Sequence, residues 1–344
     1  MAERVHKRKR SLAETPVDIS KLRAAQNRLA SLKEEVGDIE ETKDEMAKVM
    51  EHIRALEVIL GNVKKPRVTF STVKLEDLKT VGVERKRLIF DDSMVMSLMD
   101  SITTEVDAEV KDLHSRVQKI YKHVNMDFEP GSRMILDAVL LALTEIASIQ
   151  QGVERREVAI LPEMRIAPGE GVRVVNPVSG YEIWLSGNVD YAVIAYDDVK
   201  DNKGEPHPNL TLAHLTIMFL ARLLRPGGSR QDALLIARGQ LFLVEAKRQG
   251  ERDLSSYTPD AVSQAIALLK SANLEEARFC LSDGETWIFF ILKSENGKLT
   301  YYESAPRLLN RYLLEHSDMS LREIVQLVCE WLRPTQADLF ALDG

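Results

Sequence analysis

Four apolar residues, Leu241-Phe242-Leu243-Val244, are followed in this chain by Glu245-Ala246-Lys247. The apolar run predicts a buried strand. Because residues two apart share one face of a strand, Glu245 and Lys247 are expected to project together from its end. Two opposite charges are costly in a plain core and are typical of a metal-dependent hydrolytic site. The alternative is a structural ion pair at the end of a strand.

A candidate partner for Glu245 lies upstream. Residues 181–194 predict two strands on either side of Ser186-Gly187, where the glycine permits a kink or a close backbone approach. Asp190 lies among the β-branched and aromatic residues of the second strand, where aspartate is rare. It is either a functional carboxylate or a residue that caps a turn.

Two further elements follow the Glu-x-Lys strand. Residues 261–270 predict a helix with Gln264 near its start, either as a site residue or as an ordinary solvated side chain. Residues 278–292 predict a β-hairpin closed by Asp283-Gly284, a dipeptide typical of tight turns between strands.

In this order, these motifs resemble the PD-(D/E)XK nuclease superfamily, which has the restriction-endonuclease-like fold. The resemblance covers about residues 131–305. It implies an α/β core with a mixed central sheet flanked by helices. It also implies an Mg²⁺-dependent nuclease that hydrolyses phosphodiester bonds, with DNA favoured over RNA as the substrate and RNA left open.

The resemblance assigns a role to each site residue. Asp190, Glu245 and the carbonyl of Ala246 would hold Mg²⁺, with Mn²⁺ as a substitute, because hard cations prefer oxygen ligands. Lys247 would either help to deprotonate the attacking water or stabilise charge on the phosphate. Gln264 would position the site.

The family often places a glutamate on its first helix. Within the predicted helix 134–149, Glu145 is the first candidate for this ligand and Asp137 the second.

The spacing between Asp190 and Glu245 is long for the family, which predicts an insertion at about 197–240. Six arginines in and after this segment are candidate phosphate contacts or ordinary solubilising charges. They are Arg222, Arg225, Arg230, Arg238, Arg248 and Arg252.

Composition sets outer bounds. The 344 residues are 44% hydrophobic and 29% charged, which is typical of a globular protein with a sizeable core. The two cysteines, Cys280 and Cys329, exclude a disulfide framework and favour a reducing compartment. The N-terminus does not have the pattern of a signal peptide, and no apolar run reaches the ~20 residues of a membrane span. The net charge of −7 argues mildly against a protein that coats nucleic acid.

The N-terminal region has its own organisation. Lys7-Arg8-Lys9-Arg10, in a tail expected to be disordered (1–17), is typical of a nuclear import signal or a nucleic-acid-touching arm. The nucleus is therefore favoured over the cytoplasm. Apolar residues at heptad spacing from Leu22 to Leu60 predict a coiled coil within 18–62, which would form a homodimer or bind another protein. A long helix that packs on its own domain is the alternative.

The remaining boundaries complete the domain prediction. Residues 63–128 are expected to be a helical connector, 129–315 the nuclease-like domain, and 316–344 a C-terminal helix and tail. Two other functions stay open: a catalytically silent scaffold or nucleic-acid-binding module, and a toxin-like nuclease of a selfish element, by similarity to the front of fungal spore-killer proteins.

Overall fold

The computed structural model describes residues 67–149, 156–167, 171–197, 241–247, 253–309, 311–335 and 338–343, and seven isolated positions between 29 and 54. Two compact units are distinguished, Met1–Lys65 with Val178–Glu182 and Pro66–Pro177 with Ile183–Gly344.

In the first unit, three residues of the predicted heptad pattern are described. Leu29, Met50 and Ile53 are helical. The coiled coil itself stays a prediction. The basic tail lies outside the described residues. So does the predicted insertion, 197–240, except for Asp197.

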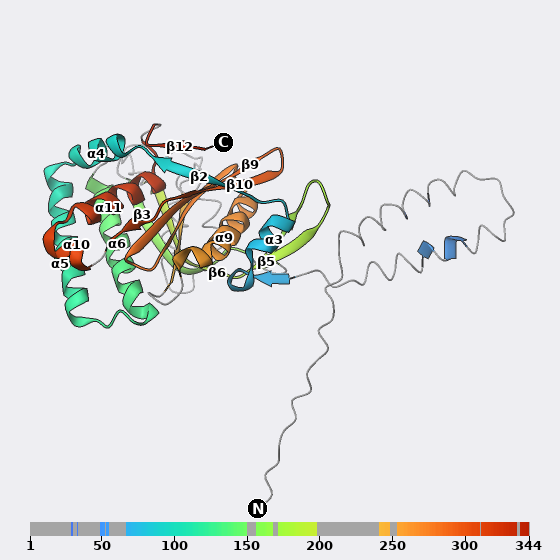
Figure 1. The fold of residues 1–344 in the computed structure, drawn as a ribbon, viewed down its shortest axis with the longest axis horizontal. Helices are drawn as coiled ribbons and strands as arrows, with labels where there is room; N and C mark the ends of the chain where they lie inside the picture. The colour runs from blue at the N-terminus through green and yellow to red at the C-terminus, as the bar shows by residue number, and fades with distance from the viewer. Residues whose placement is uncertain are drawn as a thin grey trace, which may run out of the picture. The chain divides into compact units, whose positions relative to one another are not determined.

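A mixed sheet of nine strands, counted within the described residues, is the centre of the second unit (Figure 1). The strands are β2 (Glu84–Phe90), β3 (Arg156–Arg165), β6 (Asn188–Asp197), β7 (Leu241–Ala246), β8 (Glu276–Ser282), β9 (Thr286–Glu295), β10 (Lys298–Ser304), β11 (Arg307–Leu308) and β12 (Phe340–Leu342). Their order is β12-β2-β10-β9-β8-β7-β6-β3, and β11 pairs with β9. β7 runs parallel to β8 and β2 parallel to β10, whereas the other neighbours are antiparallel. The predicted mixed sheet flanked by helices is therefore confirmed.

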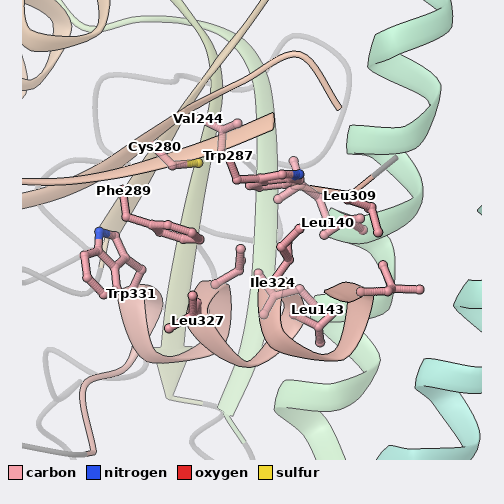
Figure 2. Close-up of a cluster of buried hydrophobic side chains, with 14 of the residues drawn as sticks. Leu140, Leu143, Val244, Cys280, Trp287, Phe289, Leu309, Ile324, Leu327 and Trp331 are labelled. Atoms are coloured by element: carbon pink, nitrogen blue, oxygen red, sulfur yellow. The ribbon is translucent and has the colours of Figure 1, made fainter. Parts of the chain in front are cut away.

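Five helices pack together on one face of this sheet (Figure 1). They are α4 (Asp92–Asp100), α5 (Thr104–His123), α6 (Glu129–Ile149), α10 (Arg311–His316) and α11 (Met319–Leu332). Figure 2 shows Trp287 and Phe289 of β9 beside Ile324, Leu327 and Trp331 of α11. Val244 of β7 joins the same apolar cluster. The interdigitated rings and aliphatic chains make this face a dry core.

The other face is covered by α9 (Thr258–Ser271), which follows the short helix η2 (Leu254–Tyr257). A second sheet, of β1 (Arg67–Thr69), β5 (Glu182–Ser186) and β4 (Val172–Val175), lies on the far side of α9 with η1 (Phe70–Thr72) and α3 (Leu75–Thr80). Because α9 is covered on both sides, every residue from Thr258 to Leu269 is buried. β7 is likewise buried on both faces, which explains its continuous apolar run.

Two glycines hold the positions that their turns require. Gly187, between β5 and β6, has φ +148°, and a Cβ there would lie 2.6 Å from Cδ2 of Phe70. Gly284 has φ +88° in the turn between β8 and β9, and a Cβ there would lie 2.9 Å from the carbonyl oxygen of Ser132. Of the two predictions for Gly187, the close backbone approach is confirmed, and so is the Asp283-Gly284 hairpin.

The segment expected to be a connector, 63–128, belongs largely to the folded core instead. Its strand β2 is paired on both sides within the main sheet, and α5 buries Val106, Val110, Leu113 and Val117 against the core. After β2, the helical part of this segment begins at Asp91, whose carboxylate accepts from the amides of Ser93 and Met94. It consists of two helices, α4 and α5, whose apolar faces pack in the core of this unit.

The C-terminal segment differs from its prediction in the same way. The C-terminal helix predicted within 316–344 forms as α11, but it packs in the core, and β12 then adds a strand beside β2. The folded unit thus extends well beyond 129–315. Among the residues with assigned structure, every helix is too short or too polar to cross a membrane.

Candidate functional site

Asp190 and Glu245 come together at the end of the β6–β7 ladder. The last paired residues of the two strands are Tyr191 and Val244, so Asp190 and Glu245 come next on each strand. Oδ2 of Asp190 accepts a hydrogen bond of 2.8 Å from the backbone amide of Ala246. The aspartate side chain thus satisfies a backbone donor where the ladder ends. The two carboxylates interact directly.

Both carboxyl groups are hard to ionise. Burial is the main cause that raises the pKa of Glu245, to about 8, and the neighbouring Asp190 adds to it. Burial also raises the pKa of Asp190, although Arg133 and the Ala246 amide oppose the shift. A hydrogen bond with Glu245 also lowers the pKa of Asp190, whereas the charge of Asp190 raises that of Glu245, so the pair favours binding a shared proton or a cation.

Lys247 lies between two carboxylates. Its Nζ is 2.6 Å from Oε1 of Glu245 and 3.1 Å from Oδ2 of Asp260, and it lies 4.9 Å from the ring centroid of Tyr257. Burial lowers the pKa of Lys247, but the two carboxylates outweigh burial and the net shift is upward. The ammonium therefore stays protonated, which favours a charge-stabilising role for Lys247 over that of a general base.

Gln264 reaches the site from α9. Its Nε2 donates to Oε2 of Glu245, and the residue is 3% exposed. The alternative of a solvated side chain is therefore wrong. Asp260, which contacts Lys247, was not predicted from the sequence. It lies four residues before Gln264, so the two share a helix face, and this spacing is the signal that could have identified it.

Arg133 of α6 is a second site residue that sequence reasoning missed. Its Nη2 donates to Oδ1 of Asp190 at 2.6 Å. Nothing in the local sequence indicates this contact, because it joins the start of a helix to a strand 57 residues later.

Glu145, predicted as the first-helix ligand, does not lie at the site. It is exposed, eight residues beyond Asp137 and twelve beyond Arg133 on α6. With a rise of 1.5 Å per residue, that is about 18 Å along the helix from the residue that contacts Asp190. Asp137, the second candidate, accepts a 2.8 Å hydrogen bond from the Tyr191 hydroxyl. Tyr191 follows Asp190 in the chain, so Asp137 contacts the sequence neighbour of Asp190.

The remaining predicted site residues fall elsewhere. Ala246 is 2% exposed and adjoins the carboxylate pair through its amide. Its carbonyl as a ligand stays a prediction. The six arginines predicted to contact nucleic acid and the four residues of the basic cluster lie outside the described residues.

The charge balance of the site tests whether a divalent cation would fit. Ion pairs at the site join five carboxylates (Glu129, Glu163, Asp190, Glu245 and Asp260) to two cations, Arg133 and Lys247. The excess of negative charge and the hard oxygen donors of Asp190 and Glu245 suit Mg²⁺ or Mn²⁺. No three His, Cys, Asp or Glu side chains converge on one point within the described ranges, so backbone oxygen and water would complete the coordination.

Two comparisons bear on identity. No protein-family model matches the chain. A search of curated proteins likewise finds no match.

Proposed function

We propose that this protein is a metal-dependent nuclease that hydrolyses phosphodiester bonds, most readily in DNA, with a restriction-endonuclease-like core. The observation that carries the proposal is the meeting of Asp190, Glu245, Lys247 and Gln264 in one network. They come from β6, the end of β7 and α9, and their residue types suit this chemistry. An ordinary core has no need to bury these four side chains in contact.

Each residue has a defined task in this proposal. Asp190, Glu245 and the Ala246 carbonyl would hold Mg²⁺, and the ion would supply Lewis-acid polarisation of the phosphate and a water of lowered pKa. Lys247, kept protonated by Glu245 and Asp260, would stabilise the charge that develops on the phosphate. Gln264 would fix the orientation of Glu245 through its hydrogen bond. Water adds to phosphorus, one P–O bond breaks, and the leaving oxygen takes a proton.

The test is cleavage of supercoiled, linear duplex and single-stranded DNA, and of RNA, in Mg²⁺, Mn²⁺ or EDTA. We expect cutting with either metal and none with EDTA. Asp190→Asn and Glu245→Gln should each lower the rate by about 10²–10³-fold or more. Glu145→Gln is the matched control, because it neutralises an exposed carboxylate far from the site, and it should cut like the wild type. Equal rates in Asp190→Asn and wild type would sink the proposal.

One observation favours a second candidate, a catalytically silent scaffold or nucleic-acid-binding module. All four carboxylate oxygens of the central pair already have protein partners: Arg133, the Ala246 amide, Lys247 and Gln264. A network satisfied in this way can persist for structure alone. Calorimetry with Mn²⁺ separates the two functions, since a folded protein that binds the ion and cuts no substrate would be the silent form.

A further inference from the structure

Arg133 is the most highly connected cation of the site. Its Nη2 is 2.6 Å from Oδ1 of Asp190, its Nη1 is 3.0 Å from Oε1 of Glu163, and its Nε is 3.0 Å from Oε1 of Glu129. The guanidinium carbon also lies 5.9 Å from the ring centroid of Tyr191. One carboxylate would neutralise the guanidinium, so three carboxylates leave an excess of negative charge around Arg133.

Glu163 contacts Arg133 from an unfavourable backbone conformation. Its neighbours pair as Pro162 with Tyr191 and Met164 with Val189, so Glu163 stands opposite Asp190 across the β3–β6 ladder. Its φ is +51°, in the left-handed region that residues other than glycine rarely adopt. Strain of this kind gathers at functional sites, where the surrounding structure enforces it. The result is a guanidinium that bridges carboxylates of two neighbouring strands.

The bridge competes with any cation at the central pair. Arg133 holds Oδ1 of Asp190, while the Ala246 amide holds Oδ2. A divalent cation shared by Asp190 and Glu245 needs an Asp190 oxygen and repels the guanidinium. Glu129 and Glu163 would still retain Arg133 at the edge of the site. The Arg133 side chain is 26% exposed, so it can be reached from solvent.

We propose that Arg133 is a substrate-binding residue with two positions, on Asp190 in the metal-free protein and on a non-bridging phosphate oxygen of the nucleic acid once a divalent cation occupies the site. The inference rests on the proposed nuclease function. A planar guanidinium can donate two parallel hydrogen bonds to a phosphate, which suits this exchange from carboxylate to phosphate. Lys247, on Glu245, would hold the opposite side of the phosphate, so that two cations bracket the carboxylate pair.

The experiment measures two quantities for the full-length protein and for Arg133→Gln. The first is Mn²⁺ affinity by titration calorimetry without nucleic acid. The second is kcat/KM for cleavage of the substrate identified above. We expect Arg133→Gln to bind Mn²⁺ at least about tenfold more tightly, because its competitor is gone, and to cleave about 10²-fold more slowly. An opposite change in the two quantities is the signature of the exchange.

Arg322→Gln is the matched control, since Arg322 also bridges two carboxylates, Asp107 and Asp318, but on α11 and away from the site. It should change neither quantity. Equal or weaker Mn²⁺ binding by Arg133→Gln would overturn the competition with the metal, and an unchanged cleavage rate would overturn the phosphate contact. If the proposed nuclease function is wrong, the wild type itself will not cleave. In that case the ratio of the Mn²⁺ affinities of Arg133→Gln and the wild type still tests whether Arg133 occupies Asp190 in the metal-free protein.

Arg133→Lys keeps the test decisive if Arg133→Gln does not fold, as judged by circular dichroism. A lysine retains the charge, but its compact ammonium lacks the planar fork with which a guanidinium donates paired hydrogen bonds. Its Mn²⁺ affinity should exceed that of the wild type by a few-fold, and its cleavage should fall at least about tenfold. Wild-type values for both would overturn the proposal.

Discussion

The two faces of strand β7 are buried to almost the same degree and hold opposite chemistry. Val244 is fully buried in the apolar cluster of Figure 2, with Trp287 and Phe289. Glu245, the next residue, is only 6% exposed and contacts Lys247 and Gln264. Burial of apolar side chains on the first face stabilises the fold, whereas burial of charged side chains on the second face costs free energy. Under the proposed function, the chemistry therefore belongs to the α9 face.

Truncation of the apolar face should have the largest effect on stability. Phe289 is fully buried, and its ring centroid lies 5.1 Å from that of Trp331 and 5.9 Å from that of Phe90. Phe289→Ala should lower the free energy of unfolding by about 3–5 kcal/mol, measured by urea denaturation. Leu308→Ala is the control, because Leu308 is 53% exposed and should cost less than about 0.5 kcal/mol. A loss below that of the control would show that the aromatic cluster is not the stabilising core.

An uncharged substitution on the α9 face should instead act on activity. Gln264→Met removes the donor to Glu245 at nearly constant volume. Cleavage should fall about 10–100-fold while the free energy of unfolding changes by only about 1 kcal/mol.

Gln326→Met on the apolar face is the counterpart of this substitution. Gln326 is equally buried, at 3% exposed, but its Nε2 has no hydrogen-bond partner among the described residues. The variant should therefore be at least as stable as the wild type and should cleave normally. If both glutamine variants lose activity to the same extent, the division between the two faces is wrong.

The smallest expected effect is a pH dependence that belongs to the charged face alone. In the folded protein the pKa of Glu245 is about 8, above its ordinary value of 4.5. The folded state therefore holds a proton that the unfolded state releases between these values, so the free energy of unfolding should fall as pH rises through this window. The fall should be seen between pH 5 and 8 in EDTA. Glu245→Gln should abolish this part of the slope, and an identical slope in both proteins would contradict the assignment.

The sequence predicted the elements of the site because each has a local signal. The apolar run before Glu245, the glycine at 187 and the Asp283-Gly284 turn all depend on neighbouring residues, and the structure has each of them where expected. Gln264 could be placed because the helix pattern around it is local too.

The missed residues depend on long-range contacts. Arg133 reaches Asp190 only because α6 begins beside the start of β6, a meeting that no periodicity encodes. The prediction of Glu145 as a ligand was wrong for a related reason. Position along the helix axis, not residue type, decides which side chain reaches a site. The strand β2 was missed because Glu84–Arg87 is charged, although Leu88 and Phe90 of the same strand are buried in the sheet.

The pairing of β2 has a consequence for biosynthesis. Its parallel partner β10 lies about 200 residues later in the chain, and its other partner, β12, ends one residue before Asp343. At about 5–20 residues per second, a ribosome takes on the order of 10–40 s to make the chain between β2 and β10. During that interval β2 has neither neighbour. Closure of the sheet must therefore wait until β10 and β12 have been made, and until then the nascent chain exposes a strand edge that a chaperone could protect.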